Sequence, residues 1–161
     1  MSIFYKSIRI GKGGKPFFLY KFRSMREESG PSSTSADDPR ITRIGRFMRR
    51  FKLDEIPQFW NILRGNMVFF GPRPDIPEVI DLMSDEERAI ILSTKPGLFD
   101  LASLSNIHEE ERLKGSKDPH ATYLKEIWPE KKRLQIECIK NRSWKLNLTI
   151  LTKTIWRIMK K

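Results

Sequence analysis

The residues best suited to chemistry are two adjacent carboxylates, Asp54 and Glu55, which closely follow the cations Arg49, Arg50 and Lys52. Nearby positive charges favour the ionised form of a carboxyl group. An ionised aspartate can act as a covalent nucleophile toward phosphorus. Positive groups are needed beside it, because a phosphate repels an attacking anion. The pattern therefore indicates phosphoryl chemistry, in which one carboxylate attacks and the other holds a cation.

The element that presents these carboxylates is predicted to be a helix from Asp54 to Leu63 that stops at Gly65, a residue type that often ends helices. Neighbouring residues on a helix point about 100° apart. The two carboxylates would then face different directions, which suits separate roles. A plainer interpretation stays open, because acidic residues favour the positive end of a helix dipole. In that case Asp54 and Glu55 would only cap the helix.

A hairpin and several amphipathic helices would have to position this site. Residues 2–25 place aromatic and β-branched side chains on either side of a glycine-rich turn, which is typical of a β-hairpin. Apolar spacing, caps and breakers predict helices at 41–51, 84–92, 120–140 with a break near Pro129, and 143–160, an extended corner at 71–74, and irregular chain at 98–119. We therefore expect an α+β fold, with a short N-terminal β-hairpin and several amphipathic helices packed around it.

Length and charge limit the class of protein. The chain has 161 residues, of which 39% are hydrophobic, and this suits one domain with a modest core. Its 31 lysines and arginines against 20 acidic residues give a formal charge of +11, which bears on binding partners rather than on fold. Nucleic acid, an anionic membrane surface and phosphorylated substrates could each explain the charge. The single cysteine, Cys138, excludes an intramolecular disulfide and favours a reducing compartment.

Nucleic acid is the least supported of these partners. The sequence contains no zinc-finger spacing, no RNA-recognition signature and no basic zipper. Phosphorylated substrates and lipid headgroups would already account for the positive charge. We therefore expect no nucleic acid among the partners, although a basic nucleic-acid-binding module remains the alternative from another functional class.

A series of short motifs surrounds the carboxylate pair. In order they are Lys21-Phe22-Arg23-Ser24-Met25, Asp38-Pro39-Arg40-Ile41-Thr42-Arg43-Ile44-Gly45, Leu53-Asp54-Glu55-Ile56-Pro57-Gln58, Asn61-Ile62-Leu63-Arg64-Gly65-Asn66-Met67, Gly71-Pro72-Arg73-Pro74 and Lys95-Pro96-Gly97. This series closely resembles the bacterial sugar transferase family, the monotopic polyprenyl-phosphate phosphoglycosyl transferases of glycan, capsule and exopolysaccharide assembly. The resemblance is highly specific over residues 16–74 and weaker from residue 98 onward, and it implies that residues 1–161 form a single catalytic domain.

The resemblance implies a two-step reaction. Asp54 would attack the sugar-bearing phosphorus of a UDP-sugar and release UMP, and polyprenyl phosphate would then capture the covalent aspartyl sugar phosphate. Glu55 would match the glutamate that binds Mg²⁺ in the family. Arg49 lies where the family uses an arginine near the phosphates, and the further phosphate-contact candidates are Arg73, Lys21 and Arg23. Arg73 could instead only anchor a loop, and Lys21 and Arg23 could simply face water.

The sequence departs from the family at two places. Members carry a hydrophobic re-entrant helix just before the segment that matches Ile3-Phe4-Tyr5, and this sequence does not include it. Ile107 stands where the matching subgroup has an arginine, and a misaligned His108 would be a poor substitute for a guanidinium. A chain without its anchor could be an inactive remnant, which remains a further alternative.

The C-terminal segment predicts contact with a membrane surface. Trp144, Trp156 and Met159 lie among lysines and arginines on an amphipathic helix, which suits a lipid headgroup interface. The alternative is a helix that packs on its own domain. With the resemblance, this pattern places the protein at the cytoplasmic face of the bacterial inner membrane, as a peripheral or monotopic protein.

Overall fold

The computed structural model describes residues 2–30, 33–106 and 109–160. It begins with an antiparallel hairpin formed by β1 (Phe4–Ile10) and β2 (Pro16–Phe22), which a short 3₁₀ turn, η1 (Lys12–Gly14), connects. The register places Lys21 opposite Tyr5. The predicted hairpin is therefore confirmed, and its second strand carries one of the candidate phosphate-contact residues.

Helices make up most of the remaining described chain, together with one small pair of strands. In order these elements are α1 (Arg43–Arg50), η2 (Leu53–Glu55), α2 (Gln58–Leu63), β3 (Val68–Phe70), α3 (Pro77–Asp81), α4 (Asp85–Leu92), β4 (Gly97–Phe99), α5 (Leu101–Ser105), α6 (Glu109–Arg112), α7 (Pro119–Thr122), η3 (Tyr123–Ile127), α8 (Trp128–Lys140) and α9 (Trp144–Met159). The expected α+β class is confirmed. Near Pro129 the chain stays helical but changes type, because the π-helical turn η3 leads directly into a new α-helix, α8.

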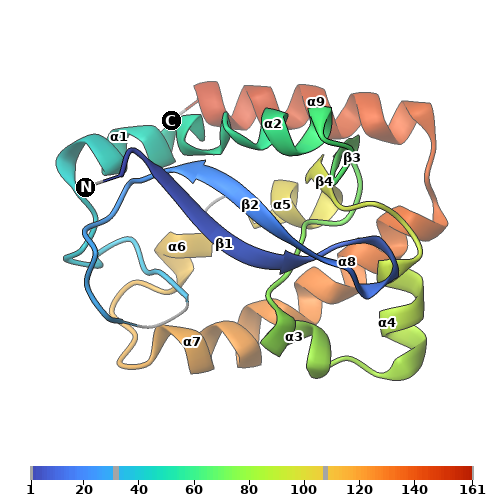
Figure 1. Ribbon diagram of the computed structural model, residues 1–161, viewed down its shortest axis with the longest axis horizontal. Coiled ribbons are helices and arrows are strands. Elements are labelled where there is room, and N and C mark those ends of the chain that lie inside the picture. Colours follow the sequence, from blue (N-terminus) through green and yellow to red (C-terminus); the bar gives the residue numbers. More distant parts are fainter. Residues whose placement is uncertain (1, 31–32, 107–108, 161) are drawn as a thin grey trace.

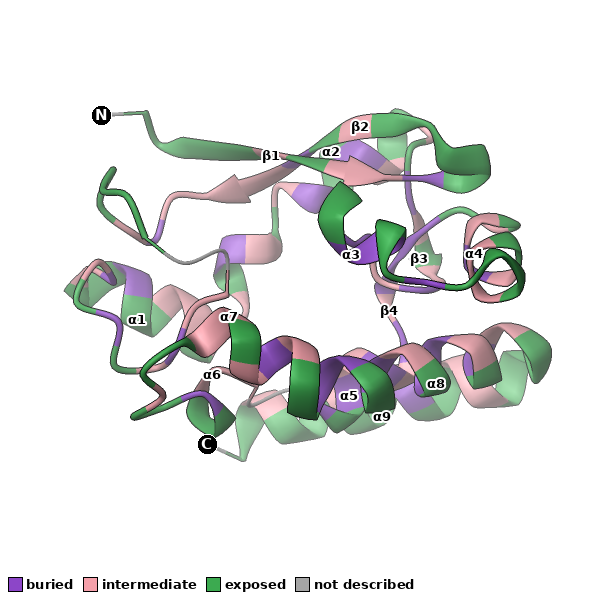
Figure 2. Ribbon diagram, turned by 90° about the horizontal axis from the view of Figure 1, so that it is seen from below, coloured by how far each residue is buried: buried purple, intermediate pink, exposed green. Residues whose placement is uncertain are grey.

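The hairpin and the long C-terminal helices lie on opposite sides of the molecule. Figure 1 shows β1 and β2 crossing the front, with α1, α2 and α9 along the upper edge and α3, α7 and α8 below. Figure 2 shows the hairpin on one side and α5, α8 and α9 on the other, and buried residues line the space between them. Within the described part of the chain, no helix combines the length and apolarity that crossing a bilayer requires.

The main hydrophobic core forms where α3 and α4 pack against η3 and α8. Its buried members are Val79, Ile80, Met83, Ile91, Leu113, Tyr123, Ile127 and Trp128. Helix α4 is held at its start by the predicted capping box, in which Ser84 and Glu87 bond each other's backbone N–H groups. This core anchors the C-terminal end of the segment that carries Arg73.

A short parallel pair fixes the other end of that segment. β3 and β4 pair with Val68 opposite Gly97 and Phe70 opposite Phe99. Gly71 lies so close to Gly97 that a Cβ on Gly97 would come within 2.2 Å of the Gly71 nitrogen, which only glycine avoids. The Pro-Arg-Pro corner therefore leaves this pair along a fixed path.

The predicted helix from Asp54 to Leu63 is wrong in its first half. Asp54 and Glu55 lie in the 3₁₀ turn η2, and α2 begins only after Pro57. Lys52 precedes the turn in the left-handed conformation, with φ of 55°. A non-glycine residue there costs roughly 1–2 kcal/mol, so the surrounding structure must hold it. The carboxylates therefore sit in a tight turn between two helices rather than on a continuous helix.

The prediction of irregular chain at 98–119 is also wrong. This segment contains the end of β4, then α5 and α6. Asp100 starts α5 by accepting a hydrogen bond from the Ser103 N–H at 2.6 Å, an N-cap that the sequence analysis overlooked. The predicted departure at Ile107, and the alternative at His108, lie outside the described residues.

Candidate active site

Asp54 lies at the wall of a large cavity with one oxygen unpaired. Its side chain is buried, at 5% exposure. Oδ1 finds no hydrogen-bond partner among the described residues, whereas buried polar atoms almost always have one. The cavity has a volume of about 960 Å³, and Lys21, Lys52, Glu55 and Arg73 also line it. Asp54 is therefore a carboxylate that lines a cavity together with cations and keeps one buried oxygen without a partner.

Glu55 bonds to two of the predicted cations. Arg73 donates to both carboxylate oxygens, with 3.0 Å between Nη1 and Oε2, and Lys21 Nζ lies 3.4 Å from Oε1. A two-bond Arg–carboxylate contact fixes geometry as well as supplying energy. These three side chains come from η2, the Pro-Arg-Pro corner and β2. The structure therefore brings together residues that are up to 52 positions apart in the sequence.

Charge pairing sets the protonation state of this cluster. Burial alone would raise the pKa of Glu55, but the charges of Arg73 and Lys21 outweigh it and hold that pKa well below the usual 4.5. Burial lowers the pKa of Lys21, although Glu55 opposes this shift. Burial also acts to lower the pKa of Arg73, yet Glu55 raises it overall. Glu55 is therefore ionised at neutral pH, and Arg73 is its charged partner.

Asn61 locks the strand that carries Lys21 onto the helix that follows the carboxylates. It is fully buried in α2. Its Nδ2 donates to the Phe18 carbonyl at 2.7 Å, and its Oδ1 accepts from the Tyr20 N–H at 3.1 Å. One side chain thus satisfies two backbone groups of β2 that would otherwise be unpaired. This clamp sets the distance between Lys21 and Glu55.

Arg73 is positioned through its backbone. Its N–H donates to Asp100 Oδ2 at 3.3 Å, and its carbonyl accepts from Gln135 Nε2 at 3.4 Å. Pro72 and Pro74 restrict the chain on either side. The guanidinium is therefore directed at Glu55 from a rigid base, with α5 on one side and α8 on the other.

Arg49 and Arg23 line the same cavity but have other partners. Arg49 donates from Nε to Ser24 Oγ and from Nη1 to Glu110 Oε1, each at 2.8 Å. Arg23 lies near the end of the hairpin, where it pairs with Glu27 at 2.8 Å and donates to the Ser2 carbonyl. Of the four predicted phosphate contacts, Lys21 and Arg73 thus join Glu55 directly. Arg49 and Arg23 line the cavity through contacts with other residues.

Sequence reasoning missed several polar residues of the cavity, which are Asp75, Asp100, Tyr123 and Lys131. Lys52, which the sequence indicated only as a neighbouring cation, lines the cavity as well. Lys131 and Tyr123 lie about 70 positions further along the chain in helical sequence that resembles an ordinary amphipathic surface, so only the fold reveals them.

The donor set fits a Mg²⁺ ion that shares its coordination with substrate. No group of three or more acidic, histidine or cysteine side chains suited to a metal occurs among residues 2–30, 33–106 and 109–160. Mg²⁺ typically uses one or two carboxylates together with substrate phosphates. Asp54 Oδ1 is unpaired, and Glu55 retains acceptor capacity beyond its bonds to Arg73 and Lys21. These two carboxylates could therefore hold the ion once a diphosphate is bound.

A comparison of the whole sequence with known families decides the classification. Residues 1–161 match the profile described as "Bacterial sugar transferase". The chain belongs to this family. The resemblance inferred from the motifs is therefore confirmed, and the acidic turn and the Pro-Arg-Pro corner are the candidate active site of this family member.

Three relatives of this sugar transferase illustrate the family, and two of them carry names that specify undecaprenyl phosphate. "Uncharacterized sugar transferase EpsL" of Bacillus subtilis is 31% identical over 158 residues, which make up 98% of this chain and 70% of the relative. A second Bacillus subtilis protein, provisionally named undecaprenyl-phosphate N-acetylgalactosaminyl 1-phosphate transferase, is 49% identical over 85 residues, or 51% of this chain and 48% of the relative. The UDP-glucose:undecaprenyl-phosphate glucose-1-phosphate transferase of Escherichia coli is 43% identical over 75 residues, or 45% of this chain and 16% of the relative. The aligned stretch thus covers less than half of the last two relatives.

Proposed function

We propose that this chain is a single catalytic domain that transfers a sugar phosphate from a UDP-sugar to polyprenyl phosphate. In the first step Asp54 attacks the phosphorus that bears the sugar. A P–O bond forms to the aspartate, and the bond to UMP breaks with its electron pair on UMP. In the second step a phosphate oxygen of the lipid attacks the same phosphorus, and Asp54 leaves as a carboxylate. The product is a polyprenyl diphosphosugar, the first intermediate of capsule, exopolysaccharide or glycan assembly.

The observation that carries this proposal is the difference in hydrogen-bond partners between the two carboxylates. Glu55 is held by Arg73 and Lys21, whereas Asp54 lines the cavity and its buried Oδ1 has no partner in the described chain. Leaving a buried carboxylate oxygen unpaired costs free energy unless a ligand completes it. A carboxylate that lines the cavity and keeps an unpaired oxygen suits a nucleophile better than a structural cap.

The cations around Asp54 make its attack on an anionic phosphate possible. Lys21, Lys52 and Arg73 line the cavity with Asp54, and Arg49 borders the same space. Preorganised positive groups stabilise charge that develops in the transition state without further reorganisation. When bound, Mg²⁺ would offset further negative charge on the diphosphate. Asp54 and Glu55 would hold it, while the arginines and lysines orient the phosphates.

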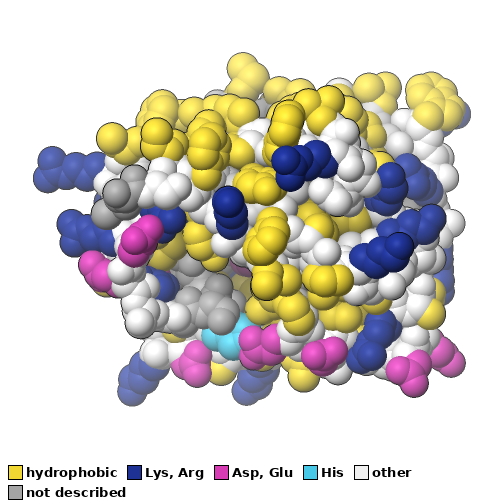
Figure 3. Space-filling view, viewed as in Figure 1, with side chains coloured by type: hydrophobic (Ala, Val, Ile, Leu, Met, Phe, Trp, Pro, Cys, Tyr) yellow, Lys and Arg dark blue, Asp and Glu magenta, His cyan; other side chains and the backbone are white. Residues whose placement is uncertain are grey.

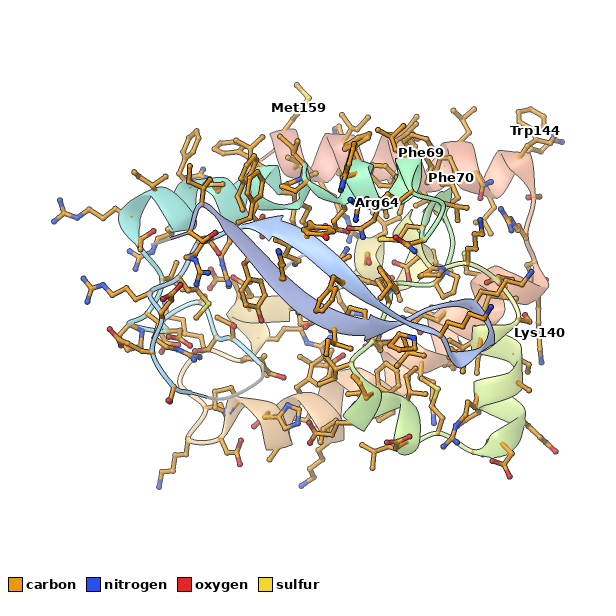
Figure 4. The ribbon with its side chains drawn as sticks, viewed as in Figure 1. Arg64, Phe69, Phe70, Lys140, Trp144 and Met159 are labelled. Atoms are coloured by element: carbon orange, nitrogen blue, oxygen red, sulfur yellow. The ribbon has the colours of Figure 1, made fainter. Side chains whose placement is uncertain are left out.

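The polyprenyl substrate implies a membrane, and one face of the molecule fits a lipid surface. We define the apolar face as the exposed apolar side chains of α1, α2 and α9, which are Ile44, Phe47, Phe59, Trp60, Leu63, Trp144, Leu148, Ile155, Trp156 and Met159. Hydrophobic side chains gather along this edge in Figure 3. In Figure 4 Trp144 and Met159 project from opposite ends of α9 toward the same side. Exposed apolar surface of this extent is typical of a binding surface.

Cations border the apolar face, as the headgroup region of an anionic bilayer requires. The Lys160 ammonium lies 4.6 Å from the Trp156 ring centroid, and the Arg64 guanidinium lies 5.0 Å from that of Trp60. On its inner side α9 buries Ile150, so the helix both packs on the domain and exposes aromatic residues. We infer that this face rests on the cytoplasmic leaflet of the bacterial inner membrane, where polyprenyl phosphate is reached.

Isotope exchange tests the proposed chemistry without the lipid. The first step alone exchanges labelled UMP into a UDP-sugar, so we expect Asp54→Asn to abolish exchange and the exposed control Asp85→Asn to retain it. Normal exchange by Asp54→Asn would require another nucleophile. Glu55→Gln is expected to weaken the response to Mg²⁺, and an unchanged magnesium titration would contradict its role as a ligand. If the unaltered chain incorporates labelled UMP into none of the UDP-sugars tested, the alternative of an inactive remnant is correct.

A further inference from the structure

The cavity continues beyond the acidic turn to a second group of polar side chains. Asp75, Tyr123 and Lys131 line the same cavity as Asp54. Each is buried, with 6–7% of its surface exposed. The proposed phosphoryl transfer uses none of them. Ionisable groups that are buried together in a cavity mark a functional site more often than a stabilising core, because their desolvation is costly.

These residues belong to two hydrogen-bonded groups, one around Lys131 and one around Gln135 of α8, which we call together the network on α8. Lys131 Nζ donates to the Tyr123 hydroxyl at 3.0 Å and to Glu109 Oε2 at 3.2 Å. One turn later Gln135 Nε2 donates to Asp75 Oδ2 at 3.3 Å. Lys131 and Gln135 share one side of the helix, because residues four apart are neighbours there. The α8 helix therefore holds both a donor cluster and an acceptor against the cavity.

The network is tied directly to the phosphate end of the cavity. Arg73 and Asp75 are two residues apart on a chain that Pro72 and Pro74 restrict, and both side chains line the cavity. Gln135 bonds both the Arg73 carbonyl and the Asp75 carboxyl. A diphosphate placed beside Arg73 would consequently leave one of its substituents next to Asp75.

The protonation states suit recognition of hydroxyl groups. Burial raises the pKa of Tyr123 to about 12, so the phenol stays neutral. Its oxygen accepts from Lys131, which leaves the phenolic hydrogen for a ligand oxygen. Burial acts to lower the pKa of Lys131, but Glu109 raises it overall, so Lys131 stays charged and can only donate. Asp75 offers acceptor oxygens. Convergent donors and acceptors of this kind match a polyhydroxyl ring better than an aromatic base.

We propose that Asp75, Tyr123 and Lys131 form the sugar-binding end of the cavity and select the hexose by its hydroxyl or N-acetyl substituents. The inference rests on the proposed function, because it takes a nucleotide sugar as the ligand. A site built to bond a particular hydroxyl discriminates strongly against an analogue that lacks it, since the buried partner is then left unpaired. Lys21, Arg73 and the acidic turn would bind every UDP-sugar alike, and the network on α8 would distinguish them.

Binding measurements test this inference separately from turnover. The dissociation constants of UMP, UDP-glucose, UDP-galactose and their two N-acetyl derivatives would be measured calorimetrically on Asp54→Asn protein, in which the first step is blocked. We expect Tyr123→Phe to raise the dissociation constant of the preferred UDP-sugar by about tenfold and to reduce the preference for this sugar over its epimer. The dissociation constant of UMP should change by less than about twofold. Tyr20→Phe makes the same chemical change on β2, where Tyr20 does not line the cavity, and should leave every constant unchanged.

Several results would overturn the assignment. Equal weakening of UMP and of every UDP-sugar in Tyr123→Phe would place the nucleotide at this end. An unaltered sugar preference in both Tyr123→Phe and Asp75→Asn would mean that the network is only structural, as would a fall in thermal stability without a change in preference. If the unaltered chain bound UDP-sugars selectively but exchanged no UMP, this inference would stand and the proposed reaction would be refuted.

Discussion

The guanidinium of Arg73 grips Glu55 through two hydrogen bonds, one of them 3.0 Å long between Nη1 and Oε2. Replacing Arg73 by lysine keeps the charge but removes the planar fork, so Glu55 and a bound phosphate lose their fixed orientation. We expect Arg73→Lys to lower kcat/KM for UMP exchange by at least about tenfold, with a small change in Tm. Arg133→Lys on the exposed side of α8 is the control. Exchange at the normal rate in Arg73→Lys would show that the fork has no part in the reaction.

Asn61 should prove more important for stability than its size suggests. Asn61→Ala leaves the Phe18 carbonyl and the Tyr20 N–H without their side-chain partner. Each unsatisfied buried group costs about 1–3 kcal/mol, so the free energy of unfolding should fall by about 2 kcal/mol or more. Urea unfolding measures this value, with Asn141→Ala at the exposed end of α8 as the matched control. Equal stabilities of the two variants would contradict the clamp between β2 and α2.

Ionised Glu55 should make the free energy of unfolding decrease as the pH falls. Its folded pKa lies below the ordinary value of 4.5, chiefly because Arg73 and Lys21 oppose the effect of burial. The unfolded state therefore binds this proton first as pH falls. The stabilisation is complete above the unfolded pKa and is lost as pH falls through the folded pKa. We expect the unaltered chain to lose more unfolding free energy between pH 7 and pH 3 than Glu55→Gln does. The exposed variant Glu86→Gln should follow the unaltered chain, and parallel curves for all three would exclude the effect.

The apolar face should control binding to lipid vesicles. Leu63 and Met159 are 78% and 76% exposed, so the double variant Leu63→Ser, Met159→Ser should fold normally. Removing two apolar side chains from a lipid contact should weaken partitioning onto vesicles that contain anionic lipid by about tenfold or more. Leu82→Ser, at the end of α3 away from this face, removes a leucine that is 58% exposed and serves as control. Sedimentation with vesicles measures the bound fraction. Equal loss of vesicle binding in the double variant and in Leu82→Ser would rule out the apolar face as the specific lipid contact.

The sequence was informative where a local signal decides the structure. The aromatic hairpin, the capping box at Ser84 and the serine cap of α9 each follow from nearby residue types, and the structure contains all three. The start of the predicted helix at Asp54 was wrong, because Lys52 adopts a left-handed conformation that no local preference of lysine indicates. Tertiary contacts stabilise that turn, and short sequence patterns do not contain them.

The candidate site shows the same limit. Asp54 and Glu55 could be selected from their adjacency and the surrounding cations, and the resemblance to a family added Arg73 and Lys21. Both cations bond Glu55, and Asp54 Oδ1 is left without a partner in the described chain. This outcome depends on the tertiary contact between β2 and the proline corner, which short sequence patterns do not contain. Tyr123 and Lys131 come from a distant helical segment and could not be assigned to the cavity without the fold.

Intact-mass analysis of the chain after incubation with a UDP-sugar tests the central claim most directly. The account predicts a mass increase of one sugar phosphate on the unaltered protein, located on the peptide that contains Asp54 and removed when polyprenyl phosphate is added. Asp54→Asn should show no increase under the same conditions. A sugar phosphate found on any other residue, or an equal increase in Asp54→Asn, would contradict the account.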